Sequence, residues 1–119
     1  MTKKITCDNC EIFEDASINF NEVTKVELRN EFAFIHFQNN TFRVIDISST
    51  NCTSKLPSDY FFNISDNIYI NLFYVYNFIK GKDVMVFMED GSHIIMSDEK
   101  YETFIRAINR LSSQMWKCH

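Results

Sequence analysis

Residues 61–72 have the sequence Phe-Phe-Asn-Ile-Ser-Asp-Asn-Ile-Tyr-Ile-Asn-Leu, and this stretch decides the fold. Its two leading aromatic residues favour a strand, and the polar triplet Ser65-Asp66-Asn67 predicts a loop. Beyond the loop, the apolar residues from Ile68 to Val75 have a spacing that suits one or two turns of buried helix. The stretch therefore predicts a strand, a loop and a short helix in succession.

Downstream of this stretch, turn signals separate three short apolar runs. The runs are Tyr76–Ile79, Val84–Met88 and Ile94–Met96, with Gly81 and the pair Asp90-Gly91 between them. Glycine-containing turns between apolar runs of this length predict a three-stranded meander.

The last part of the chain has the period of an amphipathic helix. Asp98 stands at an N-cap position, and Glu102 is placed to pair with Arg106 one turn later. One face of the helix is apolar and consists of Tyr101, Phe104, Ile105, Ile108 and Leu111. We expect this helix to cover a sheet.

Upstream, the pattern predicts hairpins. A strand is expected over residues 23–29, where apolar and charged residues alternate, and a second over the aromatic run 32–37. Asn39-Asn40 is expected to be a two-residue connection to a third strand around 42–45. Ser48 and Ser49 are expected to cap a short, marginal helix that ends near Leu56.

Length and composition fit one domain. The chain has 119 residues, of which 45% are hydrophobic. That is enough for one modest core and too little for two. We divide the chain into a lead-in of uncertain structure, residues 1–22, and a domain over residues 23–119.

No export or membrane signal is evident. No apolar run approaches the length that spans a bilayer, and charged residues follow the basic amino terminus where a signal peptide needs an apolar segment. We expect a cytoplasmic protein with reduced thiols and no membrane partner. The net charge of −4 argues mildly against nucleic acid as a partner.

Motifs for catalysis or metal binding are weak. Cys7-x-x-Cys10 with Cys118 and His119 would form a four-ligand zinc site only if the chain ends meet, so reduced thiols are the default interpretation. Two glycines give no phosphate-binding loop and no nucleophile elbow, and the histidines are too far apart for a cluster. We expect no enzyme activity, no cofactor and no small-molecule substrate.

The ordered combination of these elements resembles the LytTR-type DNA-binding domain of bacterial transcription regulators. The match consists of an aromatic residue, a polar loop, two apolar positions and an asparagine, here Phe61 to Asn71, followed by Asp90-Gly91 and the pair Met96-Ser97. The resemblance covers about residues 23–111. It implies a mainly β, α+β fold of antiparallel hairpins and a meander, with short helices and one C-terminal helix.

The resemblance also implies a mechanism, in which loops instead of a recognition helix enter successive major grooves of promoter DNA. The loops expected to do so are 29–31, 65–67 and 97–99. A pair of chains is expected on repeated sites, because one small domain buries too little surface to specify a genomic site. The expected DNA-binding residues are Arg29, Asn30, Glu31, Arg43, Ser65, Asp66, Asn67, Lys80, Lys82, Asp98 and Lys100.

The loops depart from the family in their charge. Glu31, Asp66 and Asp98 stand where family members usually offer donors, and carboxylates repel phosphates. The alternative is therefore a degenerate LytTR-like module that binds a protein instead of DNA. Asn71 and Ser97 are expected to be structural residues, the first holding neighbouring backbone and the second a cap or turn residue.

Overall fold

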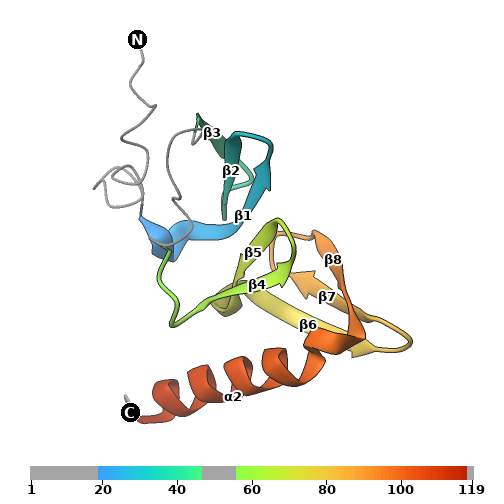
Figure 1. Ribbon diagram of the computed structural model, residues 1–119. Coiled ribbons are helices and arrows are strands. Elements are labelled where there is room, and N and C mark those ends of the chain that lie inside the picture. Colours follow the sequence, from blue (N-terminus) through green and yellow to red (C-terminus); the bar gives the residue numbers. More distant parts are fainter. Residues whose placement is uncertain (1–18, 47–55, 118–119) are drawn as a thin grey trace.

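The computed structural model describes residues 19–46 and 56–117 (Figure 1). Strands dominate, and a single α-helix ends the described chain. In chain order the elements are η2 (Phe20–Glu22), β1 (Val23–Arg29), β2 (Phe32–Phe37), β3 (Phe42–Asp46), β4 (Phe61–Ser65), β5 (Ile68–Asn71), η4 (Leu72–Tyr74), β6 (Val75–Lys80), β7 (Val84–Met88), β8 (His93–Met96), η5 (Asp98–Lys100) and α2 (Tyr101–Lys117), where η marks a 3₁₀-helix.

The strands form two antiparallel sheets. The larger has the order β3-β2-β1-β5-β4, and the smaller is the meander β6-β7-β8. In the larger sheet β1 pairs with β2 on one side and with β5 on the other, where Lys25 lies opposite Ile70. The expected mainly β class, the strands 23–29 and 32–37 and the three-stranded meander are confirmed.

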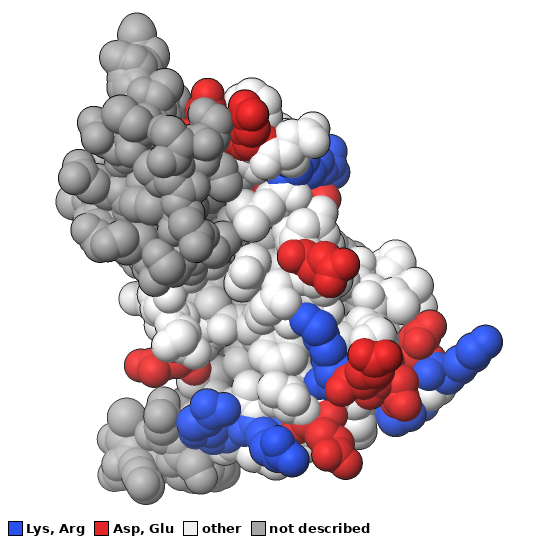
Figure 2. All heavy atoms as spheres, viewed as in Figure 1, with Lys and Arg blue, Asp and Glu red and all other residues white. Residues whose placement is uncertain are grey.

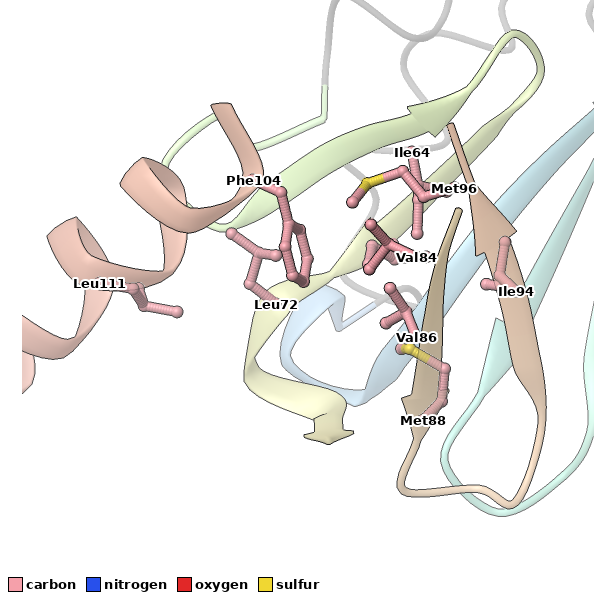
Figure 3. Packing of buried hydrophobic residues seen from close by; sticks show 10 residues of the cluster. Ile64, Leu72, Val84, Val86, Met88, Ile94, Met96, Phe104 and Leu111 are labelled. Carbon is pink, nitrogen blue, oxygen red and sulfur yellow. The ribbon is translucent and has the colours of Figure 1, made fainter. Parts of the chain in front are cut away.

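Two clusters of buried side chains hold the sheets. The first core lies on one face of the larger sheet and contains Val23, Val26, Ala33, Ile35, Ile45, Leu56 and Phe61. The second core lies between the β4–β5 hairpin, the smaller sheet and α2, where Phe104 inserts among strand residues (Figure 3). Its members are Ile64, Ile70, Leu72, Val84, Val86, Met88, Ile94, Met96, Phe104 and Leu111.

The helix expected over Ile68–Val75 is confirmed only at Leu72–Tyr74, which form one 3₁₀ turn, and is wrong for the residues around it. Residues 68–71 form strand β5, a single 3₁₀ turn follows, and β6 begins at Val75. The reason is that β5 is apolar on both faces: Tyr69 packs against the first core, while Ile70 belongs to the second. A strand that is buried on both sides shows a continuous apolar run, which the sequence pattern does not distinguish from a buried helix.

Two local expectations are also corrected. The β2–β3 connection has four residues instead of two, because Asn39 Oδ1 accepts hydrogen bonds from the amide and hydroxyl of Thr41 and Asn40 adopts φ 68°. Asp98 does not cap the last helix. It is the first residue of η5, Ser97 stands at the cap position without a side-chain cap bond, and the α-helix begins at Tyr101.

Other expectations fall outside what the structure tests. The helix expected at 48–56 lies almost entirely outside the described residues, and the division of the chain at residue 22 stays a prediction. The pairing of Glu102 with Arg106 is confirmed at 3.7 Å.

Asn71 is fully buried, and its amide joins three segments of backbone. Its Nδ2 donates to the carbonyl of Val23 at 2.9 Å and to that of Phe20 at 3.3 Å, while its Oδ1 accepts from the amide of Phe73 at 2.9 Å. The structural role expected of Asn71 is confirmed.

His36, on β2, is partly buried, whereas His93, the other histidine that the structure describes, is exposed. Its Nε2 is buried and has no hydrogen-bond partner among the described residues. Burial, helped by the charge of Lys25, lowers the pKa of His36, although Glu27 and Asp90 act in the opposite direction. The neutral imidazole is therefore the form that the fold favours.

We expect Asn71→Ala to lower the free energy of unfolding by about 2–3 kcal/mol, because it leaves buried backbone groups without partners. Urea denaturation measures the change. The control Asn77→Ala, at an exposed strand position, should stay within about 0.5 kcal/mol of the parent. Equal effects of the two substitutions would contradict the role of Asn71.

We expect His36 to make stability depend on pH. The unfolded chain binds a proton near pH 6.5 and the folded chain binds it only at lower pH, so the contribution is complete above about 6.5 and is lost as the pH falls below that value. Urea denaturation between about pH 7.5 and 5.5 measures the slope. His36→Gln should flatten it and the exposed control His93→Gln should not; an unchanged slope in His36→Gln would refute the assignment.

Candidate nucleic-acid interface

The β1–β2 turn is the first of the three loops expected to contact DNA. Asn30 adopts the left-handed conformation, with φ 56°, which asparagine tolerates better than most residues. Asn30 and Glu31 are both exposed, and Arg29 ends strand β1 beside them. The turn thus presents an amide and a carboxylate to solvent.

The β4–β5 turn lies directly beside the first loop. The amide of Leu28 donates to the carbonyl of Asn67 at 2.8 Å, and Asn67 Nδ2 donates back to the carbonyl of Leu28 at 3.0 Å. Asp66 and Asn67 are exposed at the tip, while Ser65 is the last residue of β4. The reciprocal bonds hold two loops that are distant in sequence side by side.

The third loop, η5, is attached to the same hairpin through Lys100. The Nζ atom of Lys100 donates to Oδ1 of Asn63 at 2.7 Å and to the carbonyl of Asn63 at 2.9 Å. Asn63 lies on β4, just before the turn that carries Asp66. The three loops are therefore linked in one series, and they follow one side of the molecule in Figure 1.

The end of β6 contributes a further basic group next to η5. Lys80 forms an ion pair with Asp98 at 2.7 Å and lies 5.5 Å from the ring centre of Tyr101. The hydrogen bond with Asp98 raises the pKa of Lys80 above its usual value. Lys82, in the following turn, is exposed and has no ion pair or hydrogen bond with another described side chain.

The remaining arginines are placed differently. Arg29 Nε is bonded to Glu27 at 3.0 Å, and its guanidinium lies over the ring of Phe34 at 5.1 Å. Arg43, on β3, lies opposite Ile35 of β2, towards the β2–β3 turn. Its guanidinium is 6.0 Å from the ring centre of Phe37. Arg43 is the one predicted site residue that the structure places at the far end of the sheet from the three loops.

Each of the three loops carries an exposed carboxylate: Glu31, Asp66 and Asp98. On the face drawn in Figure 2, Lys and Arg are interspersed with Asp and Glu, and neither sign forms one continuous patch. This face therefore lacks the strong positive potential of a uniformly basic surface, and its exposed polar groups would have to act through individual hydrogen bonds.

Asn63 contacts two of the three loops, a position that the sequence did not indicate. Its importance comes from contacts with Lys100, which is distant in sequence, and asparagine inside a strand pattern is only a weak signal of an irregularity. A register shift does occur in the β4–β5 pairing between Asn63 and Ser65.

The described residues show no group of three or more His, Cys, Asp or Glu that could hold a metal ion. Cys7, Cys10, Cys118 and His119, which were weighed as zinc ligands and interpreted as reduced thiols and a lone histidine, lie outside the described residues. No helix within 19–46 or 56–117 has the length and apolar character needed to cross a membrane.

Comparison with known proteins identifies a matching family. The LytTr DNA-binding domain family matches residues 15–109. A solved LytTr DNA-binding domain from Bacillus cereus has a similar fold, with a TM-score of 0.64 and 14% identity over 76% of this chain and 84% of that chain. No curated protein matches the sequence. Because the family match spans most of the chain and the fold agrees with it, the chain belongs to the LytTR DNA-binding domain family.

Proposed function

We propose that this chain is a DNA-binding transcription regulator that inserts its three loops into the major groove of promoter DNA. Family membership and the side-by-side arrangement of the loops support the proposal. The residues assigned to the interface are Arg29, Asn30, Glu31, Ser65, Asp66, Asn67, Lys80, Lys82, Asp98 and Lys100. Arg43, which was also expected there, lies towards the β2–β3 turn and is left out of the proposed interface. The protein would act on genomic DNA in the cytoplasm.

The exposed side chains suit a division between base contacts and backbone contacts. Asn30 offers an exposed amide that matches an adenine edge. The exposed ammonium of Lys82 suits a phosphate oxygen. Base edges would then supply the specificity that a surface of mixed charge cannot supply through phosphate attraction.

A single copy presents few groups to DNA. Sequence-specific binding to one site in a genome normally requires more contacts than three short loops can provide. We therefore propose that two copies bind repeated half-sites, so that the contacts of both contribute to the affinity.

The acidic loops favour a second candidate, a LytTR-like module that binds a protein partner. Glu31, Asp66 and Asp98 repel phosphates, and Lys80 is already paired with Asp98. Such a module would keep the fold and the linked loops while it lacks affinity for DNA.

Selection from random-sequence duplexes with the purified protein, followed by mobility shifts at several salt concentrations, separates the two candidates. A regulator should enrich a common sequence, and the logarithm of its binding constant should fall linearly with the logarithm of salt concentration. The absence of any enriched fragment in dilute buffer would refute DNA binding and favour the protein-binding module.

We expect neutralising an acidic loop residue to strengthen DNA binding. Glu31→Gln or Asp66→Asn removes a charge near the phosphates and should tighten binding about fivefold, equivalent to about 1 kcal/mol. The matched control is Asp59→Asn, since Asp59 lies in the turn before β4, at the other end of the β4–β5 hairpin. Equal effects of the three substitutions would argue against the loops as the interface.

A further inference from the structure

The ammonium group of Lys100 is held by one residue. Two of its three donors are used by Asn63, at 2.7 Å on Oδ1 and 2.9 Å on the carbonyl oxygen, and the lysine is only partly exposed. Most surface lysines keep their ammonium in water, so a pair of short bonds to one partner fixes this side chain to an unusual degree.

The charge of Lys100 also fixes the orientation of the Asn63 amide. Only the oxygen of the amide can face an ammonium, so the Nδ2 group must point the other way. There it donates to the carbonyl of Ser65 at 2.5 Å and to that of Ile68 at 3.3 Å. Those two carbonyls lie on either side of the Asp66-Asn67 tip, and the pairing of β4 with β5 shifts register just before the tip, between Asn63 and Ser65.

A bulge of this kind changes the direction in which the following residues point. By holding the backbone on both sides of the turn, Asn63 fixes the direction of the β4–β5 tip. Asn67 passes this constraint to the β1–β2 turn through its two bonds with Leu28. One series of contacts thus runs from η5 through Lys100, Asn63 and Asn67 to the β1–β2 turn.

We propose that Lys100 and Asn63 are positioning residues that hold the three loops as one rigid reading unit. Lys100 then belongs to the interface through this positioning role and not as a phosphate contact. The DNA part of this inference rests on the proposed function. The coupling between the loops is a property of the free protein and is tested without DNA.

Amide hydrogen exchange of the free protein tests the coupling. Lys100→Met keeps the aliphatic stem and removes the ammonium. We expect it to speed exchange of the Leu28 amide about tenfold, because the loss of a charge-assisted hydrogen bond loosens the turn to which that amide is bonded. The Met88 amide, bonded to Ser92 in the β7–β8 turn, should exchange as before.

Lys82→Met is the matched control, since Lys82 is an exposed lysine of the neighbouring β6–β7 turn. It should leave exchange at Leu28 unchanged. Equal exchange of the Leu28 amide in Lys100→Met and in the parent would overturn the coupling.

A second variant checks the pathway. Asn63→Ala should also speed exchange at Leu28, and the double variant should be no faster than Asn63→Ala alone, because both substitutions break the same series of contacts. Additive effects in the double variant would show that the two residues act separately and would contradict the proposal.

Binding to the selected duplex and to a scrambled duplex tests the role in DNA recognition. A lysine that contacts a phosphate reduces the salt slope by about one when it is removed and weakens both duplexes alike. We expect that behaviour from Lys82→Met. From Lys100→Met we expect an unchanged slope and about a tenfold loss in the ratio of selected to scrambled binding, with a melting temperature close to that of the parent.

The two failures are distinguishable. A reduced slope with an unchanged ratio in Lys100→Met would make Lys100 a phosphate contact and overturn the positioning role. If the parent protein binds no duplex at all, the proposed function fails, while faster exchange at Leu28 would still establish that the loops are coupled.

Discussion

The burial of β5 on both of its faces is the constraint on which the rest of the structure depends. Tyr69 packs against the first core, Ile70 lies fully inside the second, and the two edges of the strand pair with β1 and β4. This strand of four residues thus joins the larger sheet to the meander and the helix. The same strand fixes the positions of the two hairpin turns, because both turns lie at the end where β1 and β5 run side by side.

The sequence was informative wherever contacts are local. Alternation along β1, the aromatic run of β2 and the Asp90-Gly91 turn predicted hairpins correctly, since hairpin partners are neighbours in the chain. It failed for β5, where apolar residues face two cores and the period of a strand disappears. The sequence located the three loops but did not show that they are bonded to one another. The bonds between Asn67 and Leu28 and between Lys100 and Asn63 join residues far apart in sequence.

The electrostatics of the candidate interface differ from those of a strongly basic surface. Lys80 is paired with Asp98 and Arg29 with Glu27, and the charged ammonium of Lys100 is held against Asn63 instead of extending into solvent. Few cations therefore remain to attract phosphates, so affinity would depend on how accurately the base-contacting groups are placed. Rigid loops serve such a surface better than flexible ones, because they lose less conformational entropy when they bind.

The strand order has a consequence for how the chain folds. Among the described strands, every pairing except that of β1 with β5 joins strands that follow one another in sequence. Hairpins close quickly, whereas bringing β1 against β5 requires the long intervening segment to form a loop first, at a cost in chain entropy. We therefore expect that single non-local closure to limit the rate at which the native topology appears. The β4–β5 hairpin, the meander and α2, which share the second core, follow one another in the chain and can meet without it.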